Sequence, residues 1–451
     1  MLVLVSPSML TKGMFMDGLI YTDIAKNIAE GQCSFWNLQE TTTQFPQFFE
    51  HPPLMMNMLA CWMSVFGTTI LSAKAYALLM IVIAATLIIA LWHTVGHEYR
   101  TAWLPLLLWL MIPPATHFAF FNMLECTMLV FVLAAVLCML QRDGNSVWWH
   151  MGGGLLLSAA FLTKGFTGLF PLALPALHWL THRKQQSVGR ALLLTAITLL
   201  ATILPILIIV ILNPEAKHYL YTYLTHQVIG GSHVYLHNRW YIVGRFFVHT
   251  ALVWLATAVV VSITALQHRS KPSLKTFVAK HRTALMLLAL AFLGVIPMMV
   301  STKQRDFYLL TAYPVLAFSV ALIIDKEMHN QLQGLASNSI LAVFALLLLG
   351  TGVGINMANY GKAGRDNALL NDMELILPHL QKGETVGITA SMQGEYSLHS
   401  YYHIYGGITL DSQCSGSHLL TDGCTLNAEM AEQYEELCLG TQKYKLYKRK
   451  Q

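Results

Sequence analysis

Two groups of acidic residues near the N-terminus have the composition of a site for group transfer. Asp17, Tyr21 and Asp23 fall within a helix-like stretch, and the run Phe-Glu-His-Pro-Pro-Leu places Glu50 beside a Pro-Pro stop. Carboxylates can act as general bases or orient a nucleophile. Acids gathered in this way could surround the head group of an amphiphilic substrate. Ordinary solvation of a surface loop is the alternative interpretation.

Cationic residues form a second set. Lys164 lies in a Thr-Lys-Gly motif between two apolar segments, and Lys303, Arg305, Asp306 and Tyr308 cluster at the start of another. Ammonium and guanidinium groups both bind phosphate oxygens, so these residues are typical of a site for an anionic lipid phosphate. The alternatives are snorkelling of Lys164 to lipid head groups and pairing of the later loop with Asp306 and head groups.

The stretch 213–249 is rich in histidine and aromatic residues. It contains His218, His226, His233, His237, Arg239, His249, Tyr219, Tyr221, Tyr223, Trp240 and Tyr241. Histidine is the commonest metal ligand, but no HExxH occurs here, and the one HxxxH spacing, from His233 to His237, lies in a loop and not on one predicted helix face. The seven cysteines follow no CxxC or zinc-like pattern. We therefore predict no metal. An aromatic belt at the membrane surface explains the Tyr and Trp residues, and the three tyrosines are expected to contact the bilayer or a lipid tail.

The composition of the chain limits which elements can position these residues. Of its 451 residues, 55% are hydrophobic and 11% are charged, against about 25% charged in a typical soluble domain. The mean hydropathy is +0.51, and apolar runs recur at a length that suits a bilayer. These features exclude a soluble enzyme and the disordered, fibrous and nucleic-acid-binding classes. They predict an all-α polytopic membrane protein.

Ten transmembrane helices are predicted. They cover residues 71–92, 102–120, 123–140, 147–163, 166–180, 191–212, 242–266, 284–300, 307–324 and 340–357. The apolar segment 54–66 extends only about 20 Å as a helix, short of a hydrocarbon core of about 30 Å, so we expect an interfacial helix. Residues 1–16 resemble the outer end of an eleventh helix whose first half is missing. They lack the basic region and cleavage site of a signal peptide.

The loops predict the orientation. Loops 181–190 and 267–282 are rich in Lys and Arg and are expected on the cytoplasmic side. The segment before residue 71, the loops 213–241 and 301–306, and everything after about residue 358 then lie on the opposite, periplasmic or lumenal, face.

The last 90 or so residues change composition and read as a small α/β module. Strands are expected over 384–389 and 407–410, a helix over 395–403, and a possible third strand over 443–447. Cys414 and Cys424 are compatible with a disulfide in an oxidising compartment or with two unpaired thiols. The predicted domains are residues 1–70 (a truncated first helix and an outer loop), 71–357 (the transmembrane helices) and 358–451 (the periplasmic module).

Four motifs in order resemble a known superfamily. They are the stretch from Asp17 to Ala25, the Phe-Glu-His-Pro-Pro run, the Thr-Lys-Gly motif, and the stretch from Lys303 to Pro314. Together they resemble the GT-C glycosyltransferases that use polyprenyl-phosphate sugars, namely the protein O-mannosyltransferase and aminoarabinose-transferase superfamily (glycosyltransferase family 39). The resemblance covers about the first 325 residues. The α/β tail is similar to the periplasmic domain of the bacterial aminoarabinose-transferase-like members.

The resemblance implies a GT-C fold and transfer of a sugar, with inversion, from an undecaprenyl- or dolichyl-phosphate donor to a lipid or protein acceptor. It implies that Asp17 is the general base or the group that orients the acceptor oxygen, and that Glu50 assists at the sugar or the acceptor. Lys303 and Arg305, with His51 if protonated, would hold the phosphate. The substrate-binding and phosphate-binding set is His51, Tyr21, Lys164, Lys303, Arg305 and Tyr308. A bacterial inner membrane, with the site facing the periplasm, is the expected location.

Two departures from the superfamily pattern keep other functions open. Gly18 stands where an acid usually follows Asp17, so Glu50 or Asp23 would take over more of the role of the missing acid. The Arg that some members carry in the second outer loop is missing, and Arg239 or Arg245 could substitute. A carrier or flippase for an amphiphilic lipid-linked substrate is one alternative. A catalytically silent assembly protein is another. Carriers usually place charges near the membrane midplane, whereas the charges here cluster at one surface, which favours an enzyme.

Overall fold

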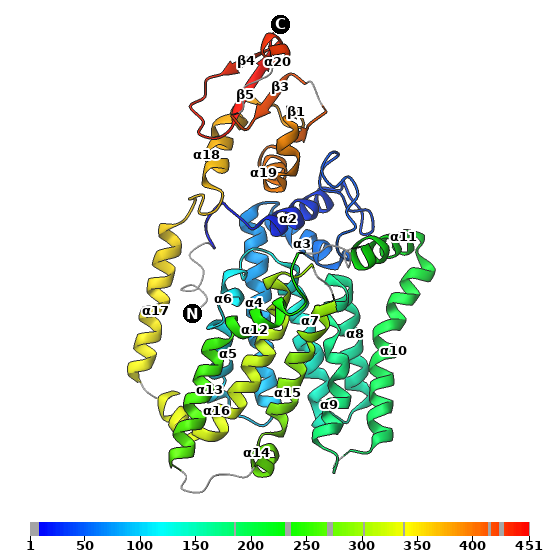
Figure 1. Cartoon of the computed structure of the whole chain (residues 1–451), viewed down its shortest axis with the longest axis vertical. Coiled ribbons are helices and arrows are strands. Elements are labelled where there is room, and N and C mark those ends of the chain that lie inside the picture. Colours follow the sequence, from blue (N-terminus) through cyan, green and yellow to red (C-terminus); the bar gives the residue numbers. More distant parts are fainter. Residues whose placement is uncertain are drawn as a thin grey trace.

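The computed structural model describes residues 9–450 except 185, 231–235, 268–273, 301–302, 337–338, 414–415 and 424–427. A bundle of long helices forms most of the molecule, a layer of short helices crosses one end of it, and a small sheet module stands beyond that layer (Figure 1). The chain is an integral membrane protein. Four of the described helical stretches are long and apolar enough to cross a membrane, or five if one bent pair counts as a single span.

The bundle consists of eight main helices. They are α4 (Ile70–Thr94), α7 (Leu124–Leu140), α8 (Val147–Lys164), α10 (Val188–Leu212), α13 (Ala251–Gln267), α15 (Arg282–Leu293), α16 (Ala312–Ala336) and α17 (Ser339–Ala358). Most of α16 is buried inside the bundle, whereas the apolar side chains of α10 are mostly exposed to the surroundings. Burial in protein and contact with lipid both favour Leu, Ile, Val and Ala, so composition alone does not separate these two helices.

Several predicted spans are interrupted. The span expected over 102–120 divides into α5 (Trp103–Leu110) and α6 (Pro113–His117), because proline cannot continue a helix. The span expected over 166–180 is two 3-10 turns, η3 (Phe166–Gly168) and η4 (Phe170–Ala173), before the short helix α9 (Leu174–Thr181). The single helices expected there are therefore wrong.

Three further spans also deviate from one regular helix. The span expected over 242–266 is α12 (Tyr241–His249) followed by α13, with a bend of 57° between them. Helix α15 continues into the 3-10 turn η7 (Ile296–Val300), and α16 is preceded by the 3-10 turn η8 (Asp306–Thr311). The remaining short elements are η1 (Tyr99–Thr101), η2 (Gln141–Gly144) and α14 (Leu274–Lys280).

Short helices lie across the end of the bundle nearest the sheet module (Figure 1). They are α2 (Met16–Ala29), α3 (Leu54–Phe66), α11 (Pro214–Thr222) and the π-helix η5 (Tyr223–Ile229). Helix α3 has the bounds expected for the interfacial helix. Of the expected truncated helix over 1–16, residues 1–8 lie outside the described residues. Residues 9–15 are non-helical, and the Lys12 and Gly13 amides donate to the carbonyls of Lys362 and Ala363 at 2.8 and 2.9 Å.

The C-terminal module is a five-stranded mixed sheet with helices. It contains α18 (Asn367–Ile376), η9 (Leu377–His379), β1 (Thr385–Ile388), η10 (Ala390–Gly394), α19 (Tyr396–Gly406), β2 (Thr409–Asp411), β3 (His418–Thr421), α20 (Ala428–Gln433), β4 (Tyr434–Leu437) and β5 (Lys445–Arg449). The strand order is β2-β1-β3-β5-β4. Strand β1 pairs in parallel with β2 and β3, and β5 pairs antiparallel with β3 and β4. The predicted α/β module is confirmed, although β3 and β4 were not predicted. The cysteine pair lies outside the described residues.

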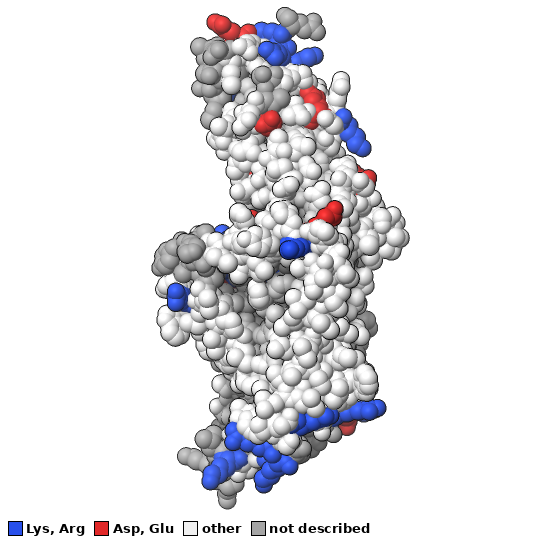
Figure 2. Space-filling model, turned by 90° about the vertical axis from the view of Figure 1, so that its right-hand side faces the viewer, with Lys and Arg blue, Asp and Glu red and all other residues white. Residues whose placement is uncertain are grey.

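Charge is distributed unevenly along the molecule. Lys and Arg gather at the end of the bundle opposite the sheet module, where α14 and the connection between α9 and α10 lie (Figures 1 and 2). The long sides of the bundle are almost free of charge in the view of Figure 2. Such sides are expected where a helical bundle faces hydrocarbon.

Candidate active site

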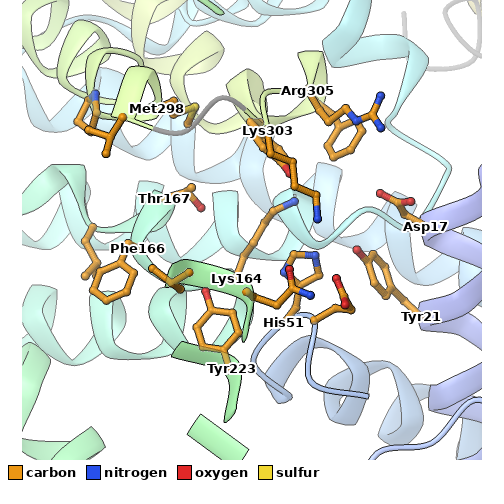
Figure 3. A pocket seen from close by; sticks show the side chains of 18 of the residues that line it. Asp17, Tyr21, His51, Lys164, Phe166, Thr167, Tyr223, Met298, Lys303 and Arg305 are labelled. Carbon is orange, nitrogen blue, oxygen red and sulfur yellow. The ribbon is translucent and has the colours of Figure 1, made fainter. Parts of the chain in front are cut away.

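One cavity of about 880 Å³ opens between α2, the 45–51 segment, the end of α8, and η3, η5, η7 and η8. All eight residues proposed from the sequence line it: Asp17, Tyr21, Glu50, His51, Lys164, Lys303, Arg305 and Tyr308. The side chains of Lys164, Lys303, His51 and Tyr21 converge on one space, with Asp17 approaching from α2 (Figure 3). Segments nearly 300 residues apart in the sequence thus meet at one place. Their individual roles stay predictions.

Asp17 occupies the first turn of α2, where the helix dipole favours a carboxylate. Burial raises the pKa of Asp17, while the positive charges of Lys164, Arg305 and Lys303 act in the opposite direction. The carboxyl therefore faces three cations across the cavity and is also partly withdrawn from water. A carboxyl in such surroundings is suited to accept a proton from a bound hydroxyl.

Glu50 and His51 come from the segment that precedes the Pro-Pro stop. Burial raises the pKa of Glu50, Lys303 lowers it and Asp17 raises it further. Burial and two nearby lysines hold the pKa of His51 far below its usual value. His51 is therefore neutral at neutral pH, and it adds no positive charge for a phosphate.

A buried tyrosine, Tyr219 of α11, fixes this segment. Its hydroxyl donates to the main-chain carbonyl of His51 at 2.7 Å, and its ring packs edge-on against Phe49. The expectation that Tyr219 contacts the bilayer is wrong, because its side chain is fully buried. Tyr223 is also buried and lines the cavity, whereas Tyr221 is exposed.

Lys164, the last residue of α8, is buried and forms an ion pair with Glu125 in the first turn of α7. Its ammonium also lies 5.2 Å from the ring centre of Phe307 and 4.8 Å from that of Tyr308, in the range of cation–π contacts. The snorkelling alternative is therefore wrong. Glu125 was missed because it falls in an apolar run, yet an acid inside a span signals a buried partner.

The residue after Lys164 must be glycine in this structure. Gly165 has φ +83°, which side chains rarely adopt, and an added Cβ would lie 2.0 Å from the Tyr223 hydroxyl. This sharp turn ends α8 and leaves Lys164 at the cavity. The Thr-Lys-Gly motif thus has a conformational basis.

Lys303 and Arg305 project from a loop that Gln304 anchors. The buried Gln304 side chain accepts from the Ile242 amide at 2.9 Å and donates to the Met298 carbonyl at 3.2 Å. These bonds tie the loop to α12 and η7, so that its two cations flank the anchor. A neutral glutamine carries no sequence signature for such a role, and it was not predicted.

Asp306 does not neutralise these cations. Its carboxylate accepts hydrogen bonds from the Arg245 guanidinium at 3.0 and 3.1 Å and from the Tyr241 hydroxyl at 3.1 Å. The alternative in which Asp306 accounts for the charge of its own loop is therefore wrong. Arg245 is engaged in this pair, and neither Arg245 nor Arg239 lines the cavity. Neither of them substitutes for the missing arginine of the second outer loop.

The two acids expected to compensate for Gly18 differ in position. Asp23 is fully buried, pairs with His403 at 2.7 Å and does not line the cavity, whereas Glu50 does. At Gly18 an added Cβ would lie 1.7 Å from the Phe121 carbonyl oxygen, so no side chain fits there. The missing acid follows from the close packing of α2 on the bundle.

The far part of the cavity is apolar. Its wall contains Phe166, Leu169, Phe170, Leu293, Pro297 and Met298. In Figure 3, Phe166 and Met298 lie on the side of the cavity away from Asp17 and Tyr21. A ligand with a charged head and an apolar tail fits this division. In the described part of the chain, no group of three or more His, Cys, Asp or Glu side chains is arranged to hold a metal ion.

Comparison with known proteins places the fold. The crystal structure of ArnT from Cupriavidus metallidurans bound to undecaprenyl phosphate matches 99% of this chain and 95% of its own, with a TM-score of 0.69 and 16% identity. The chain has the fold of ArnT. The apo structure of ArnT matches 97% of this chain and 94% of its own, with a TM-score of 0.66 and 14% identity. No family model and no curated protein matches the sequence. The GT-C fold expected from the motifs is thereby confirmed.

Proposed function

We propose that this protein is a membrane glycosyltransferase that moves a sugar from a polyprenyl-phosphate donor to a lipid or protein acceptor. The observation that carries the proposal is the single cavity in which the carboxyls of Asp17 and Glu50 face the cations Lys164, Lys303 and Arg305, with an apolar extension alongside. The cations suit the phosphate, and the extension suits the prenyl chain. The fold shared with ArnT, which was crystallised with undecaprenyl phosphate, supports this assignment.

The chemistry follows from the positions of the charges. Asp17 accepts the proton of the acceptor hydroxyl, or orients its oxygen, as that oxygen attacks the anomeric carbon. The bond from this carbon to the phosphate oxygen breaks, and the phosphate leaves with the electron pair. The cations Lys303, Arg305 and Lys164 stabilise the negative charge that develops on the leaving phosphate. One displacement from the face opposite the leaving group inverts the anomeric centre.

Three groups complete the proposed site. The Tyr308 hydroxyl donates a hydrogen bond to the phosphate, and its ring lies against the Lys164 ammonium. Glu50 accepts hydrogen bonds from the sugar or the acceptor. Tyr21, whose ring lies edge-on to His51 with centres 5.9 Å apart, forms the wall beside the carboxyls. Neutral His51 serves as a hydrogen-bonding partner for the substrate.

The distribution of charge supports the proposed orientation. Lys and Arg gather at the end of the bundle opposite the cavity (Figure 2), and positive loops are retained in the cytoplasm. The cavity and the sheet module then face the periplasm, in a bacterial inner membrane. A lipid-linked donor would enter from the outer leaflet.

A transfer assay tests the proposal. Purified protein in lipid vesicles is supplied with a panel of radiolabelled undecaprenyl-phosphate and dolichyl-phosphate sugars and a membrane extract as acceptor. Asp17→Asn and Glu50→Gln should lower transfer by about 10²- to 10⁴-fold, the usual contribution of a general acid or base. Glu215→Gln, at an exposed position of α11 outside the cavity, is the matched control and should transfer normally.

Outcomes of this assay separate the alternatives. If the wild type consumes no donor but moves the lipid between leaflets, the protein is a carrier. If it neither consumes nor moves any donor, an assembly role without catalysis replaces the proposal. Unchanged transfer in both carboxyl variants would refute the assigned chemistry.

A further inference from the structure

A second cavity, of about 610 Å³, lies between the N-terminal loop and the C-terminal module. It shares no lining residue with the cavity described above. Six of the residues that line it have hydroxyl or amide side chains: Asn27, Gln32, Gln39, Thr41, Thr42 and Thr409. Its lining contains no aliphatic or aromatic hydrocarbon side chain, in contrast to the first cavity. The side chains of this lining therefore suit a polar ligand better than a lipid tail.

Two buried polar groups on this wall have unused hydrogen-bonding capacity. Glu40 is fully buried, and one of its oxygens accepts from the Ser400 hydroxyl at 2.5 Å. Its other oxygen, Oε2, has no hydrogen-bond partner among the described residues. Asn27 is 2% exposed and donates to the Gln39 and Glu40 carbonyls, while its Oδ1 atom has no partner in the same described set. Buried polar atoms are normally satisfied, so these two side chains keep capacity for a further hydrogen bond.

The cavity is nearly balanced in charge. The Lys26 ammonium is held by the main-chain carbonyls of His403 and Ile404 at 2.8 and 3.3 Å. Lys382 and Glu30, of opposite charge, lie exposed at the rim. Burial raises the pKa of Glu40 well above its usual value. Because Lys26 is engaged by main-chain carbonyls and Glu30 lies at the rim, this lining suits a phosphate less well than one that gathers arginine and lysine.

Specific contacts between distant segments build this cavity. The Asp23 carboxylate pairs with His403 of α19 at 2.7 Å, and the Thr43 hydroxyl donates to the Leu410 carbonyl of β2 at 2.7 Å. Gly383 and Gly407 have φ values of +85° and +67° and line the cavity, where they allow the main chain to turn back sharply. The cavity is therefore formed where the C-terminal module packs against the N-terminal segment.

We propose that this second cavity binds a neutral oligosaccharide. Closely spaced hydroxyl, amide and carboxyl groups of both hydrogen-bonding types match a polyol, and the volume is within the range of small-ligand sites. The saccharide can be free or can be the head group of a glycolipid. The inference depends on the second cavity alone and stands whether or not the first cavity transfers sugars.

Cys33 provides a reporter, because its half-buried thiol lines this cavity. The full chain is placed in lipid nanodiscs free of glycoside detergents and is treated with iodoacetamide at alkaline pH. Peptide mass spectrometry follows alkylation of Cys33 and of two exposed internal references, Cys61 and Cys438. Maltotriose, cellotriose and chitotriose are the free probes, and a digalactosyl lipid in the nanodisc is the lipid-linked probe.

At a probe concentration ten times its Kd, alkylation of Cys33 should slow by about tenfold, because only the unoccupied fraction reacts. The two reference thiols should react at unchanged rates. Protection by a free trisaccharide identifies a soluble ligand, and protection by the glycolipid alone identifies a lipid-linked one. If no probe protects Cys33, or if all three thiols slow together, the proposal is refuted.

Side-chain variants connect the protection to this cavity. Gln32→Leu and Thr409→Val each remove hydrogen-bonding groups near its edge and should weaken protection by about two- to tenfold. Gln47→Leu, on the same N-terminal loop but outside both cavities, is the control. Equal protection in all three variants would show that Cys33 is shielded from elsewhere. These readouts do not depend on sugar transfer, so failure here and failure of the proposed function are distinguishable.

Discussion

The buried ion pair between Lys164 and Glu125 allows folding and function to be separated. The two side chains are 4% and 1% exposed. Removal of one partner, in Lys164→Met or Glu125→Leu, leaves the other charge buried without compensation. Replacement of both by apolar side chains of similar size removes two charges together. The three variants therefore make different predictions for stability.

Breaking a buried pair from one side costs about 3–5 kcal/mol, whereas replacing both partners is often neutral or stabilising. Unfolding entropy is about 2.1 cal/mol/K per residue, which for a chain of 451 residues gives a fall of about 3–5 °C in Tm for each single variant. The double variant should melt near the wild type. Its transfer rate should nevertheless fall by at least about tenfold, because the phosphate loses one of its three cations.

Thermal melts followed by tryptophan fluorescence, together with the transfer assay, measure both quantities. Lys443→Met breaks the exposed pair with Glu395, whose side chains are 46% and 33% exposed, and should leave both unchanged. A double variant with normal melting and normal transfer would refute the phosphate-binding role of Lys164. Single variants that melt like the wild type would refute the buried pair itself.

Three further predictions follow from the cavity. Because burial raises the pKa of Asp17 and Lys303 opposes this, transfer should decline as the pH falls through the raised pKa. In Lys303→Met this acid limb should move to higher pH in a pH–rate profile, and an unmoved limb would contradict the assignment. Tyr219→Phe removes the hydrogen bond to the His51 carbonyl, just before the Pro-Pro pair. It should lower the free energy of unfolding by about 0.5–1.5 kcal/mol and raise KM for the acceptor. Unchanged melting and an unchanged KM would argue against this anchor. Gly165→Ala should lose about 1–3 kcal/mol from its main-chain conformation alone, because φ +83° with ψ −145° is a combination that essentially only glycine adopts. A smaller loss for Gly165→Ala in a Tyr223→Phe background, measured in thermal melts, would separate the steric clash from this conformational cost.

The meeting of the motifs could be predicted because charged residues beside apolar runs report where a helix ends. Asp17, Glu50, Lys164 and Lys303 belong to separate motifs, yet each was placed on the same face by counting spans, and all four line one cavity. The order of the elements was enough for this result. Their distances and their pairing required the folded structure.

Other features were beyond what the sequence carries. Tyr219 and Gln304 hold the segments that carry Glu50 and Lys303 through side-chain hydrogen bonds to the main chain, and neither residue type at those positions differs from an ordinary surface residue. The neutral state of His51 depends on burial by segments distant in sequence. The break at Pro113, in contrast, could have been predicted from the sequence, because a Pro-Pro pair inside an apolar run predicts the end of a helix.

The position after Asp17 shows how packing can remove a residue that chemistry would favour. Helix α2 approaches the carbonyl of Phe121 so closely that only glycine fits at position 18. The second carboxyl of the cavity must therefore come from another segment, and Glu50 fills that place while Asp23 is used to hold the C-terminal module through His403. The absent acid was the main support for a catalytically silent protein. Since the close packing of α2 explains it, and since two carboxyls still face the cations, the arrangement favours an enzyme whose acids are divided between two segments.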